Sequence, residues 1–305
     1  MTTQFIRKAS LIVGAGNEAI DLSEMHFNFQ TTASYLPNPN TALIRVYNLS
    51  RATARKILDM GAIVQLIAGY EGNAAQIFSG NIIQARIGSE NATDTFLDIS
   101  AADGSTIYNS AFMNFTLANN SDMKSRIGTV ALAIGVKIGS YTPNTPEKSV
   151  RGRVFFGLAR DHLRNMASTV GATWTIQNGE LDIIGQSAYK PGDIPVLTAA
   201  SGVIGVPEVT LDGIEVKLLL NPNIITNGQV QLDNSLVTSF LYPAGFLEQF
   251  EKVGWVPLNT ANGIYKVLYV EHQGDTRGDD WYTKIVCYGK VVNESQFKYI
   301  NRVIS

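Results

Sequence analysis

The densest group of side chains suited to acid–base or metal chemistry lies in one loop near the end of the 305-residue chain. Residues 271–280 read Glu-His-Gln-Gly-Asp-Thr-Arg-Gly-Asp-Asp. His272, Asp275 and Asp279 are the residue types that a metal site or a hydrolase would use. The spacing fits neither, because a calcium loop runs twelve residues to a final Glu and zinc sites usually hold two or more His or Cys. We therefore expect an Asp/Gly turn, in which Arg277 pairs with a carboxylate.

Elsewhere the sequence offers no motif for catalysis. His26 lies in a predicted strand and His162 in a predicted helix, and neither has a ligand companion nearby. The chain lacks the Ser elbow of hydrolases, the H-E-x-x-H motif and the phosphate-binding loop. Its single cysteine, Cys287, lies in the middle of a predicted strand and is expected to be a small buried residue. We predict no catalytic residue, no cofactor and no metal, and hence a protein that is not an enzyme.

Basic residues gather at two places, Lys124 with Arg126 and Lys148 with Arg151 and Arg153. Phe155 and Phe156 follow the second cluster, and we interpret both as core residues rather than as a platform for stacking bases. The basic clusters are then solvated or interface surfaces.

The ligand-rich loop is positioned by the two halves of residues 263–289. Each half alternates for about eight residues, which predicts two strands. Both faces of each strand carry β-branched or aromatic residues, so we expect the hairpin to have neighbours on both sides.

Residues 1–102 are predicted to form an antiparallel β domain with a single helix. The helix is predicted over residues 51–60, with Ser50 as its N-cap and Gly61 after its end. Strands are predicted over these ranges: 5–13, 22–31, 42–48, 62–70, 76–86 and 94–102.

Residues 103–192 are predicted to form a small α+β insert. Ser121 is the expected cap of a helix over 122–133, and a second helix is expected over 158–170. A tight hairpin on Asn178-Gly179 follows, since this dipeptide is a strong signal for a two-residue turn.

Residues 193–290 are predicted to form a second β domain, and 291–305 a C-terminal tail. Strands are expected at 207–211, 213–220 and 229–233, ahead of the hairpin. The tail carries Phe297, Ile300 and Ile304 at helical spacing, which suits a partner-binding helix and a helix packed on its own domain equally. The predicted fold is thus mainly β, with two β domains flanking the α+β insert.

The composition favours assembly over a free monomer. Hydrophobic residues make up 45% of the chain and charged residues 16%, against about 25% charged in an average globular protein. A net charge of -2 gives no overall attraction to duplex DNA or anionic membranes. We expect no membrane span and no cleaved signal, and therefore synthesis in a cytoplasm.

Four stretches of the chain resemble the baseplate hub proteins of contractile-tailed bacteriophages and, more distantly, the hub part of type VI secretion spikes. The stretches that carry the resemblance are residues 40–58, 68–82, 202–233 and 263–287. The resemblance covers nearly the whole chain up to about residue 290 and follows the same order of domains. Its motifs are structural, with no catalytic residue among them.

The resemblance implies a homotrimer at the end of the tail tube. Each subunit's two β domains would be antiparallel barrels or sandwiches like the tube protein, so that six similar units adapt the sixfold tube to the threefold central spike. It also implies a lumen for the passing tape-measure protein and DNA, and a location in the tail baseplate of the virion. The expected partners are therefore the tail tube protein and the central spike protein.

A structural hub is accordingly the leading hypothesis. The residues expected at subunit or partner contacts are Leu218, Leu219, Leu220, Asn221, Pro222, Phe297 and Ile300. Two alternatives remain: a cell-wall-active hydrolase of the phage tail that uses His272, Asp275 and Asp279, and a receptor-binding or carbohydrate-binding β protein with exposed aromatic grooves.

Overall fold

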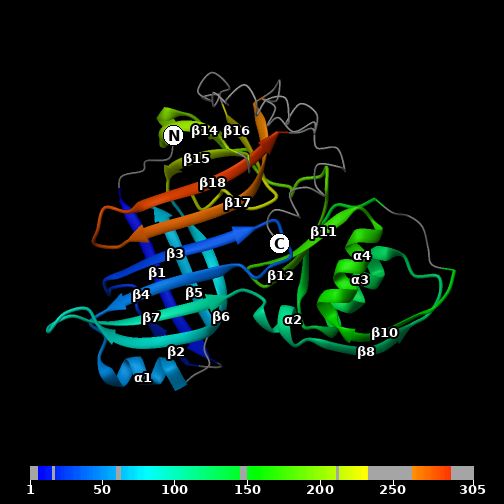
Figure 1. Ribbon diagram of the computed structural model, residues 1–305, viewed down its shortest axis with the longest axis horizontal. Coiled ribbons are helices and arrows are strands. Elements are labelled where there is room, and N and C mark those ends of the chain that lie inside the picture. Colours follow the sequence, from blue (N-terminus) through cyan, green and yellow to red (C-terminus); the bar gives the residue numbers. More distant parts are fainter. Residues whose placement is uncertain are drawn as a thin grey trace, which may run out of the picture.

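A computed structural model describes residues 6–15, 18–59, 63–144, 150–210, 213–232 and 263–289. The described part of the chain is mainly β, with 55% of its residues in strands and 16% in helices. A large antiparallel sheet occupies one end of the long axis and the small α+β insert the other (Figure 1). The predicted tail contacts Phe297 and Ile300 lie outside the described residues.

The strands are β1 (Arg7–Ala15), β2 (Glu18–Asp21), β3 (Phe27–Ser34), β4 (Thr41–Tyr47), β5 (Ile63–Tyr70), β6 (Asn73–Ser89), β7 (Thr95–Ala102), β8 (Phe112–Leu117), β9 (Lys137–Tyr141), β10 (Arg153–Leu158), β11 (Ala172–Gln177), β12 (Glu180–Gly185), β13 (Val196–Leu197), β14 (Val203–Thr210), β15 (Gly213–Leu219), β16 (Gln229–Leu232), β17 (Ile264–Asp275) and β18 (Trp281–Gly289). The helices are α1 (Arg51–Asp59), α2 (Ser105–Asn109), α3 (Met123–Ala133), α4 (Ala159–Thr169) and the 3-10 turn η1 (Ala199–Ser201). None of the described helices has the length and hydrophobicity needed to cross a membrane.

One sheet joins both ends of the chain. Its strand order is β14-β15-β18-β17-β3-β4-β7-β6-β5-β1-β2, and β16 and β13 branch from β17. The path is open in the part of the chain that the structure describes, with β14 at one edge and β2 at the other, so of the expected barrels or sandwiches no closed barrel is formed there. Because β17 pairs with β3, the two predicted β domains share one sheet. The predicted domain boundaries at residues 102 and 192 remain a prediction.

The long strand β6 turns the corner of this sheet. Its first half pairs with β5 and its second half with β7, and Asn81 is paired in both registers. A Cβ at the neighbouring Gly80 would lie 2.7 Å from the backbone carbonyl of Ala102. Glycine is therefore needed where the two layers approach each other at the bend.

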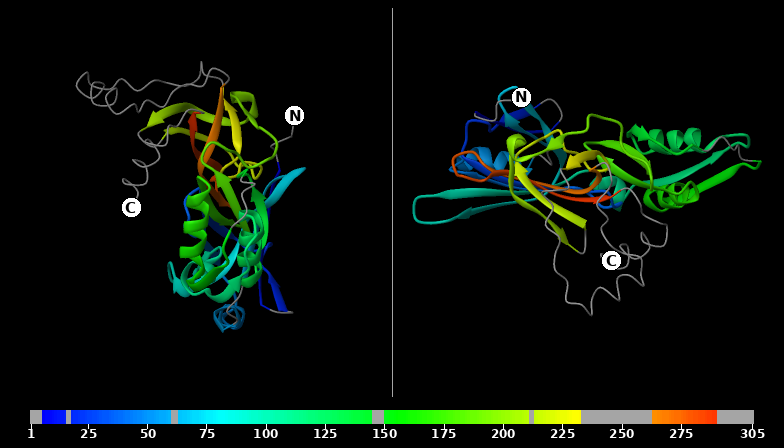
Figure 2. Two further views of the ribbon diagram at one scale, coloured as in Figure 1. Left: turned by 90° about the vertical axis from the view of Figure 1, so that its right-hand side faces the viewer. Right: turned by 90° about the horizontal axis from the view of Figure 1, so that it is seen from above.

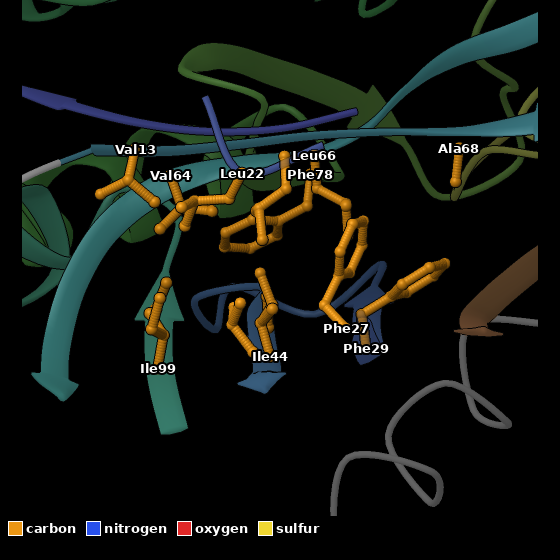
Figure 3. Packing of buried hydrophobic residues seen from close by; sticks show 14 of the residues in the cluster. Val13, Leu22, Phe27, Phe29, Ile44, Val64, Leu66, Ala68, Phe78 and Ile99 are labelled. Carbon is orange, nitrogen blue, oxygen red and sulfur yellow. The ribbon is translucent and has the colours of Figure 1, made fainter. Parts of the chain in front are cut away.

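The largest core lies between the two layers that β6 connects. Figure 3 shows Phe27, Phe29, Ile44 and Ile99 of β3, β4 and β7 pointing toward the opposite layer. The facing side chains are Val13, Leu22, Val64, Leu66 and Phe78. All are buried, as the alternation of these strands requires.

The predicted hairpin over 263–289 is confirmed, including its neighbours on both sides. Strand β17 lies against β3 and β16, and β18 lies against β15. Trp281 reaches from β18 into the core of the N-terminal strands, where its ring meets Phe29 edge-on at 5.5 Å between centroids. Its Nε1 donates to the Gly69 carbonyl at 3.2 Å.

The insert has its own core between α3, α4 and two small sheets. Strand β8 pairs with β10, and β11, β12 and β9 form the second sheet. The predicted hairpin on Asn178-Gly179 is confirmed, with positive φ at both residues as the turn requires. Strands β8, β9 and β10 and helix α2 were not predicted.

Three predictions for residues 1–192 are wrong. A single strand over residues 22–31 is not formed, because Asp21 accepts from the Ser23 amide and ends β2 in a turn. The N-cap of α3 is Asp122 rather than Ser121, since the Asp122 carboxylate accepts from the amide of Ser125. Phe156 is not a core residue, because it alternates with the buried Phe155 in β10 and is exposed.

Gly274 lies where the N-terminal strand β3 meets the C-terminal hairpin, and we expect the stability of the fold to be sensitive to a larger residue there. A Cβ there would lie 2.5 Å from the Phe29 ring and 2.8 Å from the Trp281 ring. We expect Gly274→Ala to lower the free energy of unfolding by about 1–3 kcal/mol, because the packed rings must shift. Urea unfolding of the full chain measures this.

The control is Gly192→Ala, where no atom lies within 4 Å of the added Cβ and φ is not positive. This variant should stay within about 0.5 kcal/mol of the parent. Equal effects of the two substitutions would contradict the packing argument.

Candidate functional site

The ligand-rich loop is held closed by the carboxylate of Asp275. Its Oδ1 accepts from the amides of Arg277 at 2.8 Å and Gly278 at 2.7 Å, and it lies 2.9 Å from His26 Nε2. Burial alone raises the pKa of Asp275, but these hydrogen bonds outweigh it and hold the pKa below its usual range. The loop is therefore an Asx-type turn, as predicted.

The guanidinium that braces this turn comes from Arg7 of β1. It donates to the carbonyls of Gly278 at 2.6 Å and Asp279 at 3.0 Å, and it lies over the Trp281 ring at 5.5 Å. Among the ion pairs of the described residues none involves Arg277, so the expected pairing of Arg277 with a carboxylate is wrong. Arg7, which lies 271 positions before Gly278 in the sequence, holds the turn closed instead.

His272 points away from the turn into the protein. It is buried, and its Nδ1 lies 2.8 Å from Thr283 Oγ1. Burial lowers the pKa of His272 to about 4, so the ring is neutral at physiological pH. Asp275 pairs with His26 instead, and Asp279 is exposed. The three groups of the hydrolase hypothesis therefore do not converge on one site.

The remaining candidate residues, His26, His162 and Cys287, make structural contacts with their neighbours. His26 stacks on Tyr47 at 4.4 Å, and His162 Nε2 lies 3.1 Å from the Phe156 carbonyl oxygen. Cys287 is fully buried as predicted, and burial raises the pKa of its thiol. Within the described ranges no three His, Cys, Asp or Glu residues gather closely enough to hold a metal ion.

The face of the sheet that turns away from the core forms a polar hollow of about 540 Å³. At its centre Asp98 accepts from Arg45 Nε at 2.6 Å and from Arg86 at 2.8 Å. The other lining side chains are of three kinds: the neutral polar Asn28, Gln30, Gln84, Ser100 and Gln273, the carboxylates Asp275 and Asp280, and the apolar Phe29, Leu43, Ile44 and Ile99.

The predicted contact segment 218–222 lies along β15 and the turn after it. Leu218 is buried in the C-terminal core and Leu220 in the larger core, and Pro222 is buried as well. Leu219 and Asn221 are half-buried. Only these two have side-chain surface left for another subunit, and their role there remains a prediction.

Sequence reasoning missed the joint that fixes the insert to the sheet. The Asp103 carboxylate accepts from the Gly179 amide at 3.1 Å, and Asn40 Nδ2 donates to Gln177 Oε1 at 2.8 Å. Burial raises the pKa of Asp103 to about 6 despite the hydrogen bonds from the amides of Asn178 and Gly179. The turn at Asn178-Gly179 was predicted from the sequence, but nothing in the sequence shows that it meets Asp103.

A second joint involves two lysines. Lys266 Nζ donates to the Ala188 carbonyl at 2.9 Å, and burial lowers the pKa of Lys266 to about 8. Lys190 donates its amide to the Asn227 carbonyl at 2.8 Å, and its Nζ is held within the insert by the buried carboxylate of Asp182 at 2.6 Å. The insert is therefore held to the sheet by hydrogen bonds at two points.

Comparison with known proteins gives a consistent picture. The model of the family described as baseplate hub gp41 matches residues 6–240. No curated protein matches the sequence significantly.

The fold is similar to that of several solved structures. The 43 kDa tail protein of prophage MuSo2 from Shewanella oneidensis has a TM-score of 0.59 at 10% identity, over 93% of this chain and 97% of that one. A tail protein from Neisseria meningitidis MC58 has a TM-score of 0.56 at 9% identity, over 92% and 97%. The Escherichia coli c3393 protein, a component of the type VI secretion system, has a TM-score of 0.52 at 11% identity, over 89% and 74%.

The buried imidazole of His272 predicts a loss of stability in acid. Its pKa is about 4 in the folded chain and about 6.5 when unfolded, so the unfolded chain binds more protons between these values. Its contribution is present above about pH 6.5 and falls by up to about 3 kcal/mol as the pH drops to about 4. His272→Asn should remove this part of the pH dependence.

Urea unfolding of both proteins at several pH values between about 4.5 and about 7 measures the difference. Asp103 titrates in the same range with the opposite sign, but it is present in both proteins and cancels in the comparison. Parallel pH profiles would contradict the assignment.

Proposed function

The chain belongs to the baseplate hub gp41 family, and from this premise we propose that it forms a homotrimeric ring that joins the tail tube of a contractile phage to the central spike. The observation that carries the proposal is the single antiparallel sheet built from both ends of the chain. A continuous, curved sheet of this kind can form one side of a channel, and three subunits related by a threefold axis can enclose the channel.

The pseudo-sixfold symmetry would follow from two tube-like units in each subunit. We assign residues 1–102 and 193–290 to these units, and 103–192 to the insert between them. The C-terminal unit has its own core of buried residues from β15, β16, β17 and β18, beside the larger N-terminal core. Three subunits would then present six similar units to the tube and a threefold arrangement to the spike.

The polar hollow suits the wall of a lumen. Its neutral amide and hydroxyl side chains exchange hydrogen bonds readily with water. Arg45 and Arg86 are outnumbered in this lining by Asp98, Asp275 and Asp280, so the hollow offers no net positive charge to a passing polyanion. A tape-measure protein and DNA would pass such a surface without being held by it.

In this proposal the protein acts through geometry and not through catalysis. The hydrolase alternative needs His272, Asp275 and Asp279 at one site, and Asp275 is instead paired with His26. Leu219 and Asn221 would meet a neighbouring subunit, whereas Leu218, Leu220 and Pro222 would hold that segment in place. We place Phe297 and Ile300 of the tail among the partner contacts, and the assembled protein in the baseplate of the virion after synthesis in the host cytoplasm.

The proposal predicts a trimer of 33.1 kDa subunits and a threefold ring with six lobes. Light scattering after size-exclusion chromatography and negative-stain images measure both, first for the chain alone and then with tube and spike proteins added. A protein that stays monomeric in every mixture would contradict the proposal.

A substitution at the predicted contact gives a second prediction. Leu219→Ser should weaken self-association about tenfold or more, because a half-buried apolar side chain at an interface is lost. Leu132→Ser is the matched control, since Leu132 of α3 is 80% exposed and lies in the insert. Equal association constants for the two variants would remove Leu219 from the interface.

A further inference from the structure

The two-stranded ribbon formed by β8 and β10 leaves one apolar face uncovered. Met113 and Phe155 on its inner face are buried in the core of the insert. On the outer face Phe112 is 58% exposed, Phe156 67% and Val154 65%. The two outer rings meet edge-on at 5.2 Å between centroids. The ribbon therefore presents a preassembled aromatic pair to its surroundings.

Such a face is unusual on a protein that stays alone. A two-stranded sheet gains stability by covering its faces, and large exposed apolar patches mark interaction sites. An aromatic pair is also rigid, so little conformational entropy is lost when it is covered. The exposed Arg151 lies just before β10, and Arg153 opens this strand. The outer face thus combines an apolar centre with a basic end.

The insert and the rest of the chain carry formal charges of opposite sign. Residues 103–192 hold nine Lys and Arg against six Asp and Glu, a formal charge of +3. The remaining residues hold fifteen against twenty, a formal charge of -5. A second copy of this chain therefore offers the insert a surface of opposite sign.

The complementary surface is the arm, which we define as residues 83–97 of the β6–β7 hairpin. Ile83 is the extra residue of a β-bulge and is 58% exposed, and Ile87 is 43% exposed although it lies opposite the buried Leu97. Glu90 at the tip is exposed, and Asp94 follows it. The arm and the ribbon lie at opposite ends of the long axis (Figures 1 and 2).

We propose that the arm of one copy packs on the outer face of the ribbon of the next. Ile87 would cover the pair formed by Phe112 and Phe156, with the acidic tip of the arm near the basic end of the ribbon. A contact between two different surfaces at opposite ends of a molecule is heterologous, and it gives a closed ring when the rotation between successive copies closes. The inference rests on the proposed trimer and assigns the residues that join its subunits.

The first test removes the aromatic pair. Phe112→Ser with Phe156→Ser should raise the dissociation constant of the assembly about tenfold or more, because central aromatic residues dominate interfaces. Both side chains are exposed, so the folded monomer should keep its circular dichroism and thermal midpoint. Leu132→Ser, which removes an exposed apolar side chain of α3 in the same insert, is the control and should leave association unchanged.

The second test exchanges charges across the contact. Arg151→Glu and Glu90→Lys should each weaken association, and the double variant should recover part of the loss. Sedimentation at two salt concentrations measures this, since the contribution of rim charges falls with ionic strength.

A cross-link tests the contact directly. Ile87→Cys in one copy and Phe156→Cys in another, both with the buried Cys287 replaced by Ser, should give a disulfide-linked species under mild oxidation. Neither variant alone should do so.

The outcomes separate this inference from the proposed ring. A parent trimer that persists in the Ser variants, without cross-linking, overturns the arm–ribbon contact and leaves the ring intact. Loss of binding to the tube or spike protein in those variants, with the trimer retained, assigns the ribbon to another partner and also overturns it. A parent chain that stays monomeric with the tube and spike proteins added, and forms no cross-link, overturns both.

Discussion

The pairing of β3 with β17 is the interaction on which the rest of the structure depends. It joins residues 28–34 to residues 269–275 in one antiparallel register. The Thr276 hydroxyl accepts from the Phe27 amide, and the Asp275 carboxylate pairs with His26. These contacts tie the start of β3 to the end of β17. This register places Trp281 in the N-terminal core, extends the sheet to β14 and fixes the polar hollow across the junction. Without it the chain would hold two small sheets, each with a long unpaired edge.

Local structure could be predicted from the sequence where neighbouring residues decide it. The alternation over 263–289 and the Asn178-Gly179 turn are examples, because strand and turn preferences act over a few residues. The pairing of β3 with β17 could not be predicted, since alternation shows that a strand has neighbours without showing which. Phe155 and Phe156 illustrate a related limit. The two form an apolar pair in the sequence, but an unpredicted strand buries one and exposes the other.

The candidate site shows how the same residue types can serve chemistry or architecture. Asp275, Asp279 and His272 are close in sequence, yet successive strand residues point to opposite faces, so the imidazole is buried while the carboxylates stay at the turn. The partners that give these groups their roles, Arg7 and His26, come from the other end of the chain. Sequence spacing predicted a turn at this loop, but it could not identify the arginine that closes the turn.

The distance in sequence between β3 and β17 also sets the order in which the protein can be made. His26 and Asp275 are 249 residues apart, so at about 5–20 residues per second the ribosome needs roughly 12–50 s to supply the second strand after the first. During that interval the edge of β3 is unpaired on the nascent chain, where it is open to chaperones or to wrong strands. The sheet can therefore be completed only after the hairpin of β17 and β18 has been translated.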